Sequence, residues 1–241
     1  MRIADLAPVI AATWPPAAAR AVGPFTVPEG AGGGQRVSAA RLTDPQAGDA
    51  TEAEIDAALA ALAEAGQPPL FMVLDHQTAL DDRLAARGLS VRDTTNALMT
   101  DSATLAEVPP PVSCFAVWPP LAIQTEIWAA GGIGPARLAV MARAAGPRMS
   151  FFGRIDDRPA GTAFAAILES TAMLHALEIL PQHRRKGLAG IMMRAAGDWA
   201  VSQGAARFAT LVTGENRPAQ GLYASLGFTP VGRYHYRSND A

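Results

Sequence analysis

Three consecutive cations, Arg184, Arg185 and Lys186, run into a glycine in the segment HRRKGLAG, residues 183–190. The apolar periodicity after Gly187 predicts a helix, and positive charge at a helix N-terminus opposes the helix dipole. Two interpretations stay open. The segment is a solvated basic turn, or it is a site where backbone N–H groups and cations bind a strongly negative group such as a di- or triphosphate.

The elements on either side of this turn favour a binding site. Residues 171–180 predict a strand, and residues 187–204 carry apolar side chains at helical spacing. A strand, a tight turn and a helix expose several backbone N–H groups in one concavity. Gly187 lets a ligand approach the backbone, and Ala189 keeps the first helical turn uncrowded. The spacing differs from that of a Walker A loop and from GxGxxG.

Two titratable residues on the predicted strand are candidates for a general base. Glu178 lies among apolar residues, which is unusual for a carboxylate, and His175 has an imidazole pKa nearer neutrality. Strand alternation places the two on opposite faces unless a bulge intervenes. No His, Cys, Asp and Glu cluster has metal-ligand spacing. Cys114, the single cysteine, reads as a small buried residue rather than a nucleophile.

The rest of the chain alternates strands and helices. Helices are expected at 51–66, where Thr51 and Glu54 form a capping box, and at 77–87, 121–129, 135–144 and 217–226. Strands are expected at 70–74, 89–99, 207–212 and 231–237, and two more within 148–169 around a turn at 156–159. The glycine-rich 28–35 predicts a hairpin turn between FTV and RVSAARL. This order indicates an α/β (α+β) fold.

Composition narrows the class of protein. The chain has 241 residues, 49% of them apolar and 17% charged, with a formal net charge of −2. That balance gives no case for a nucleic-acid partner. No signal peptide or membrane span is expected, and one cysteine fits a reducing compartment, so we expect a cytoplasmic protein.

Two segments resemble the GNAT superfamily of N-acetyltransferases. LEILPQHRRKGLAGIMM (177–193) is similar to its motif A, R/Q-x-x-G-x-G/A, at Arg184, Gly187 and Ala189. GENRPAQGLYASLGF (214–228) looks like the N-x-x-A-x-x-L-Y-x-x-x-G-F segment of the family. The resemblance covers about residues 113–238.

The resemblance implies an acetyl-CoA site. The pyrophosphate would be bound by backbone N–H groups of Arg185, Lys186, Gly187, Leu188 and Ala189, with charge added by Arg184. The strand 171–180 would splay from 207–212 to admit the pantetheine arm. Main-chain groups of Leu177 and Ile179 would bond the pantetheine and the acetyl carbonyl, which stabilises a developing oxyanion.

The resemblance also implies catalytic roles. Tyr223 would be the acid that protonates the departing thiolate, although by itself it reads equally as a core aromatic beside Leu222 and Leu226. Asn216 would hold the pantetheine arm or cap the helix. Glu178 is our expected base, acting through a water, and His175 is the alternative.

A weak internal repeat links the two halves. LFMVL, a helix and RLAARGLSV match in order RFATLV, a helix and LYASLGFTP, which aligns Gly88 with Gly227, Leu84 with Tyr223 and Gln77 with Asn216. Any strand–helix–glycine–strand unit could look alike. The N-terminal copy lacks the motif A spacing and the tyrosine, so we expect it to be structural or to form a wall of the acceptor site.

The sequence thus predicts a tandem or pseudo-tandem GNAT fold, a mixed, mostly antiparallel sheet flanked by helices. We expect a degenerate GNAT-like domain at 1–100, a proline-rich linker at 101–112 and an acetyltransferase domain at 113–241. The expected function is direct transfer of an acetyl group from acetyl-CoA, with no metal, to a primary amine of a small molecule or peptide. The alternatives are a non-catalytic acetyl-CoA sensor or interaction module and transfer of a longer acyl group. Homodimer formation stays open.

Overall fold

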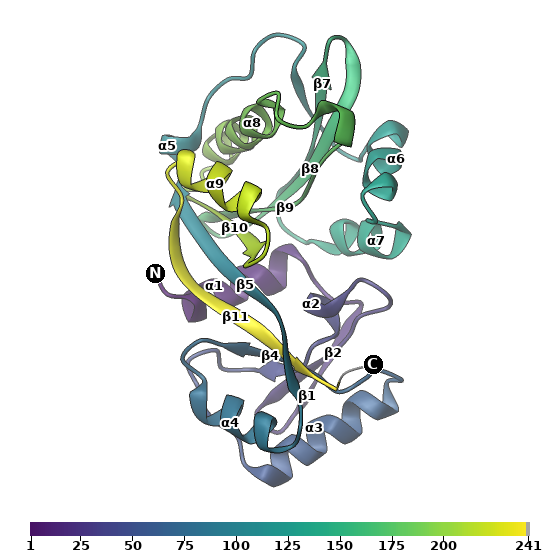
Figure 1. Ribbon diagram of the computed structural model, residues 1–241, viewed down its shortest axis with the longest axis vertical. Coiled ribbons are helices and arrows are strands. Elements are labelled where there is room, and N and C mark those ends of the chain that lie inside the picture. The colour runs from purple at the N-terminus through teal and green to yellow at the C-terminus, as the bar shows by residue number, and fades with distance from the viewer. Residues whose placement is uncertain (240–241) are drawn as a thin grey trace.

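A single eight-stranded mixed sheet runs through most of the molecule. The computed structural model describes residues 1–239, and the strand order in this sheet is β4-β11-β5-β10-β9-β8-β7-β6. A second sheet of three strands has the order β1-β2-β3. Figure 1 shows β5 and β11 as long neighbouring strands that run from one half of the molecule into the other.

The elements follow the predicted order closely. The strands are β1 (Ala18–Val22), β2 (Phe25–Glu29), β3 (Arg41–Leu42), β4 (Leu70–Leu74), β5 (Ser90–Asp101), β6 (Cys114–Val117), β7 (Arg148–Ile155), β8 (Arg158–Leu168), β9 (Thr171–Ile179), β10 (Arg207–Thr213) and β11 (Thr229–Ser238). The α-helices are α1 (Ile3–Thr13), α2 (Gln35–Ser38), α3 (Glu52–Glu64), α4 (Thr78–Ala86), α5 (Ser102–Leu105), α6 (Ala122–Ala130), α7 (Pro135–Arg143), α8 (Leu188–Ser202) and α9 (Arg217–Ser225), and Pro181–His183 form a 3₁₀ turn. The Thr51–Glu54 capping box is present as predicted.

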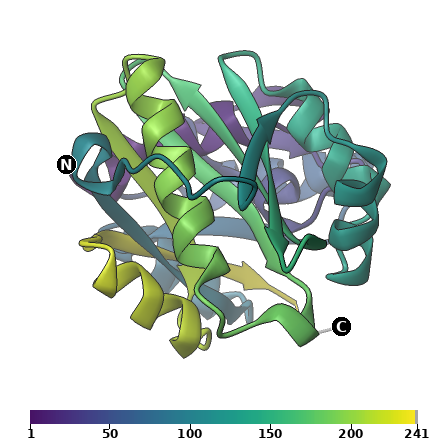
Figure 2. The same ribbon diagram turned by 90° about the horizontal axis from the view of Figure 1, so that it is seen from above.

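Helices cover both faces of the C-terminal strands. Alternating side chains of β8 separate two cores, since Ala163 and Ala165 pack with α8 while Phe164 and Ala166 pack on the side of α6 and α7. Figure 2 shows α8 on one side of these strands and α6 and α7 on the other. Strand alternation alone therefore assigns each side chain of β8 to one of the two layers.

The last strand of each half pairs with the other half. β5, before the proline-rich segment, lies between β10 and β11, and β11 in turn pairs with β4. The predicted repeat consists of the units β4-α4-β5 and β10-α9-β11. In the order β4-β11-β5-β10 these units exchange their last strands, so that β11 lies beside β4 and β5 lies beside β10. The expected boundary at 101–112 therefore does not divide the sheet, because backbone pairing crosses it.

The N-terminal half holds the three-stranded sheet, α3 and α4 around their own core. The predicted hairpin is right in part. β2 pairs with β3 antiparallel, but Gln35–Ser38 form the short helix α2, so only Arg41–Leu42 of the expected second strand is extended. The helix α1, which the sequence patterns did not single out, packs against β8, β9 and β11 and so ties the N-terminal segment to the other half.

Across the described range, no helix combines the length and apolarity needed to span a membrane.

Candidate active site

A cleft opens where β9 and β10 separate. The two strands pair in parallel only from Thr171↔Arg207 to Leu174↔Thr210. Beyond that point β10 stays paired with β5 and β9 with β8, so their facing edges leave a cleft of about 640 Å³. This is the splay that the resemblance predicted, and it presents unpaired backbone groups on each side.

A bulge in β9 shapes one wall of the cleft. Thr162 pairs with Glu178 and Phe164 with His175, so one residue of β8 faces both Ala176 and Leu177. Ala176 adopts a positive φ of 52°, and its carbonyl accepts a hydrogen bond of 2.7 Å from Trp128 Nε1. Because the extra residue shifts the alternation, His175 and Glu178 lie on the same face of the sheet, which corrects the expectation of opposite faces.

The basic turn forms a concave run of free backbone donors. Arg185 and Gly187 have positive φ values of 61° and 83°, and α8 begins directly after them. The N–H groups of residues 185–190 find no acceptor within the described chain, and the first helical bond is Ile191 N–H to the Gly187 carbonyl. The side chains of Arg185 and Lys186 are exposed. The segment thus has the geometry of an anion site at the N-terminus of a long helix.

Arg184 anchors the start of this turn. Its Nε donates to the Ile179 carbonyl at 2.9 Å, and its Nη2 donates to Glu178 Oε1 at 3.0 Å. The Glu178 side chain is 17% exposed and lies against Gly131. Glu178 is not among the residues that line the cleft. Its carboxylate is therefore engaged with Arg184 and lies outside the lining of the cleft, to which Tyr223, the expected acid, belongs.

His175 lines the cleft but both of its ring nitrogens have partners. Nδ1 lies 3.1 Å from Arg36 Nη1, and Nε2 lies 2.9 Å from Thr13 Oγ1. A guanidinium only donates, so Nδ1 accepts from Arg36 and the ring proton is on Nε2. Burial, with the nearby Arg36, lowers the pKa of His175 well below its ordinary value. His175 is a neutral group that holds Arg36, which weakens its candidacy as the base.

Tyr223 and Asn216 both lie on the cleft, on α9. Tyr223 is 6% exposed, and burial raises the pKa of its phenol although a hydrogen bond with Thr210 opposes the shift. The phenol is therefore protonated at neutral pH. Asn216 Oδ1 accepts from the Ala219 N–H at 3.2 Å, which confirms the capping role that the sequence left open.

The predicted site residues divide into two groups in space. Leu177, Asn216 and Tyr223 line the cleft. The remaining ones lie at the turn or beside it: Glu178, Ile179, Arg184, Arg185, Lys186, Gly187, Leu188 and Ala189. Among these, the Leu188 side chain is buried in the core between α8 and the sheet. Only its backbone N–H is therefore available to the turn.

The sequence patterns missed most of the far wall of the cleft. Trp14, Arg36, Arg137, Tyr234 and Tyr236 line it, and they come from four separate segments of the chain. The one available signal was the pair of tyrosines at alternating positions of the last strand, which places both on one face. No local pattern links Arg36 to them.

Other chemistry has little support at this site. Within residues 1–239, no group of three or more His, Cys, Asp and Glu is placed to hold a metal ion. Cys114 is buried, and burial raises the pKa of its thiol to about 12, so the thiolate form is disfavoured.

The comparisons with known proteins agree with this geometry. Residues 117–228 match the model of the acetyltransferase (GNAT) family. An uncharacterized N-acetyltransferase of Bacillus subtilis (strain 168), YobR, is 30% identical over 93 residues, which are 38% of this chain and 38% of that protein. The alignment thus spans well under half of that relative.

Solved structures share the fold over nearly the whole chain. A GCN5-related N-acetyltransferase from Kribbella flavida superposes with a TM-score of 0.72 at 19% identity, covering 100% of this chain and 97% of that one. A tandem GNAT protein from the clavulanic acid biosynthesis pathway gives a TM-score of 0.64 at 15% identity, covering 98% of this chain and 87% of that one. Residues 117–228 of this chain therefore form a GNAT acetyltransferase domain, within a fold shared with a tandem GNAT protein.

Proposed function

We propose that the protein transfers an acetyl group from acetyl-CoA directly to a primary amine of a small molecule or peptide. The observation that supports this proposal is that a cleft and a turn with unpaired backbone N–H groups lie next to each other. The cleft between β9 and β10 holds the buried Tyr223 hydroxyl, and the turn with unpaired N–H groups at 185–190 follows directly from the strand that walls it.

The turn is suited to the pyrophosphate of the coenzyme. Six consecutive backbone N–H groups have no acceptor among residues 1–239, and the dipole of the 15-residue α8 adds to their attraction for an anion. Arg185 and Lys186 are exposed beside them, and a bound diphosphate would relieve the charge that opposes the helix dipole. The backbone amides are the principal site, and the cations are auxiliary.

The cleft is suited to the reacting end. When bound, acetyl-CoA supplies the acetyl thioester. The free edge of β9 at Leu177 would align the pantetheine arm, whereas the Ile179 carbonyl is already occupied by Arg184. Tyr223 would donate its proton to the departing sulfur, a role that suits a phenol whose pKa burial has raised.

We assign Glu178 to holding the turn rather than to accepting the proton of the amine. Its carboxylate bonds Arg184, which in turn fixes the Ile179 carbonyl at the end of β9. Through this pair it would set the position of the first residue of the anion site. The amine's proton would then leave through water in the open cleft.

The test combines coenzyme binding with product formation. Acetyl-CoA and longer acyl-CoA thioesters are titrated by calorimetry, and thiol release is followed over classes of primary amine with mass spectrometry of the products. We expect binding of acetyl-CoA and an acetylated amine. Binding without release from any amine would favour a sensor, tighter binding of a longer thioester would favour another acyl group, and no binding would reject the proposal.

A further inference from the structure

Two arginines from opposite halves of the chain line the cleft, and they lie on α2 and α7, which Figure 1 shows on the other side of the molecule from α9. Arg36 lies on α2 and Arg137 on α7, and they share this end of the cleft with Tyr234 and Tyr236 of β11. If the proposed function is right, α9 and the β9 edge take the coenzyme arm, and this end is left for the amine acceptor. The chemistry of its lining then indicates what the acceptor carries.

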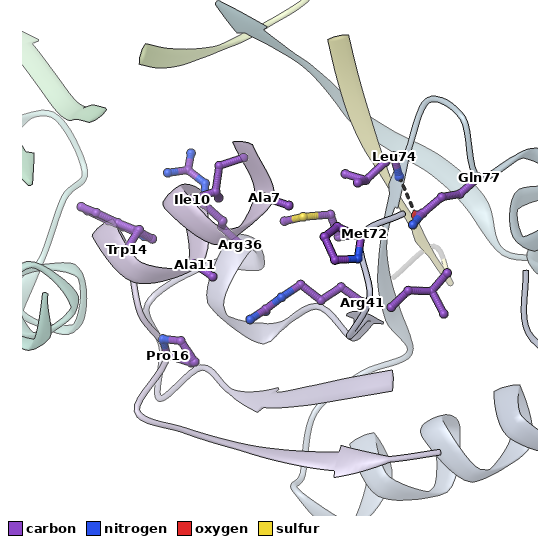
Figure 3. A pocket seen from close by; sticks show the side chains of 12 residues that line it. Ala7, Ile10, Ala11, Trp14, Pro16, Arg36, Arg41, Met72, Leu74 and Gln77 are labelled. Carbon is purple, nitrogen blue, oxygen red and sulfur yellow. Dashed lines mark hydrogen bonds between the residues drawn. The ribbon is translucent and has the colours of Figure 1, made fainter. Parts of the chain in front are cut away.

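Arg36 is fixed in place and still has an unused donor. Its Nη1 donates to His175 Nδ1 at 3.1 Å, and Tyr234 and Tyr236 line the same part of the cleft. The guanidinium carbon lies 5.8 Å from the centre of the Trp14 ring. Figure 3 shows Arg36 beside Trp14 and Ile10 at the end of α1. Its Nε is buried and has no hydrogen-bond partner within the described chain, which is costly unless a ligand provides one.

Arg137 is exposed at the mouth of the same end. Its guanidinium runs past Gly34, where a Cβ built on the glycine would lie 3.4 Å from Arg137 Nη2. Within the described chain, the Arg137 guanidinium makes no hydrogen bond or ion pair with another residue. It is therefore free to bind a ligand, and the glycine leaves space for it to do so.

The charge of the lining favours an anion. Arg36 and Arg137 are both cationic, His175 is neutral, and Asp93 is the one carboxylate among the described residues that line the cleft. A guanidinium pairs with a carboxylate through a planar fork of donors. We propose that the amine acceptor carries a carboxylate, which Arg36 and Arg137 bind from two sides, so that the substrate is an amino acid or a related ω-amino acid rather than a simple amine.

The test uses pairs of amines that differ only in this group. ω-Amino acids of graded chain length are compared with their carboxamides, first by equilibrium binding to protein saturated with coenzyme A and then by thiol release from acetyl-CoA. We expect the carboxylate of at least one pair to bind about tenfold or more tightly than its amide. Arg137→Gln should remove that preference, because it should weaken binding of the carboxylate and leave binding of the amide unchanged. Arg158→Gln, an exposed arginine at the distant β7–β8 hairpin, should leave it unchanged.

The outcomes separate this inference from the proposed function. Amides that bind and react as well as carboxylates would overturn the inference and leave acetyl transfer intact. A carboxylate preference that depends on Arg137 without any thiol release would support the site and count against the transferase. Equal binding of both members by wild type and Arg137→Gln would overturn the inference whatever the turnover. Arg137 is exposed, so its substitution leaves the fold in place, which a melting curve checks.

Discussion

The two strand–helix–strand units of the molecule have the same backbone geometry at the end of the helix and differ in the space beside the unit. In β4-α4-β5 and β10-α9-β11 the helix ends at a glycine of nearly equal backbone angle, φ 80° at Gly88 and 81° at Gly227. The following N–H bonds the aligned residue in each, Leu89 to the Leu84 carbonyl at 3.2 Å and Phe228 to the Tyr223 carbonyl at 3.0 Å. Both helices therefore end with the same glycine C-cap.

The spaces beside the two units differ widely. Next to β10 the cleft measures about 640 Å³, whereas the space next to β4 measures about 30 Å³. That small cavity is lined by Ala7, Ile10 and Ala11 of α1, with Leu74 and Gln77 of the N-terminal unit (Figure 3). Helix α1 fills the N-terminal space, and Ala40 bonds to β4 on both sides of Phe71. The space beside the N-terminal unit is therefore filled by core packing that stabilises the fold, whereas the space beside the C-terminal unit is left open for a ligand.

The largest expected effect is on turnover, and it should appear only when the aligned residue of the C-terminal unit, Tyr223, is replaced. Tyr223→Phe removes the proposed acid, so turnover should fall by about 100-fold or more while acetyl-CoA binding stays within a factor of about two. The measurement is thiol release with any amine that wild type accepts, beside calorimetry. Leu84→Met, the matched change in the buried position of the other unit, should leave turnover unaltered. Full activity of Tyr223→Phe would remove the functional asymmetry.

The N-cap residues should differ in stability rather than in activity. Gln77 is 2% exposed, and its side chain accepts from the Leu74 N–H at 2.9 Å and donates to the Ala47 carbonyl at 3.0 Å. Gln77→Ala should cost about 2 kcal/mol, because it leaves buried backbone groups unpaired. Asn216→Ala should cost about 1 kcal/mol as a lost helix cap. Denaturant unfolding measures both losses of stability. A larger loss for Asn216→Ala than for Gln77→Ala would show that the C-terminal unit contributes more to the stability of the fold.

The left-handed glycines at the two ends of α8 separate strain from binding. Gly187 and Gly204 have φ values of 83° and 80°, and a Cβ on either meets no atom within 4 Å. Alanine should strain both sites alike. Only Gly187→Ala should weaken acetyl-CoA binding, by about tenfold, because the turn then loses its preferred shape beside the ligand. Calorimetry with both variants decides, and equal affinities would place the coenzyme elsewhere.

The smallest effect is expected at Glu178. Since its carboxylate bonds Arg184 and lies outside the cleft lining, Glu178→Gln should lower turnover by less than about fivefold and act on coenzyme binding. Steady-state kinetics at saturating amine measure it. A loss near 100-fold with unchanged coenzyme affinity would instead restore Glu178 as the general base.

Much of the fold followed from local pattern. The capping box at Thr51, the strand 70–74 and the periodic helix after Gly187 were predicted from short stretches, because capping, burial and period are local properties. The repeat was visible for the same reason. The short helix α2 was missed, since four residues after a glycine run carry no helical period. The bulge at Ala176 was foreseen only as an option, because the pairing partner that creates it lies on β8.

The sequence by itself determined the basic turn before α8 and the Asn216–Tyr223 segment, since each is a contiguous motif whose spacing sets backbone geometry. The tertiary structure decided which candidates meet. It drew Glu178 to Arg184, engaged both nitrogens of His175 and brought Arg36, Arg137 and Tyr236 to one end of the cleft. The residues at this end of the cleft come from positions as far apart as 36 and 236, and Tyr236 lies on β11, which pairs with β4 and β5 of the other half. Strand pairing across such distances is set by the whole core, which no local pattern records.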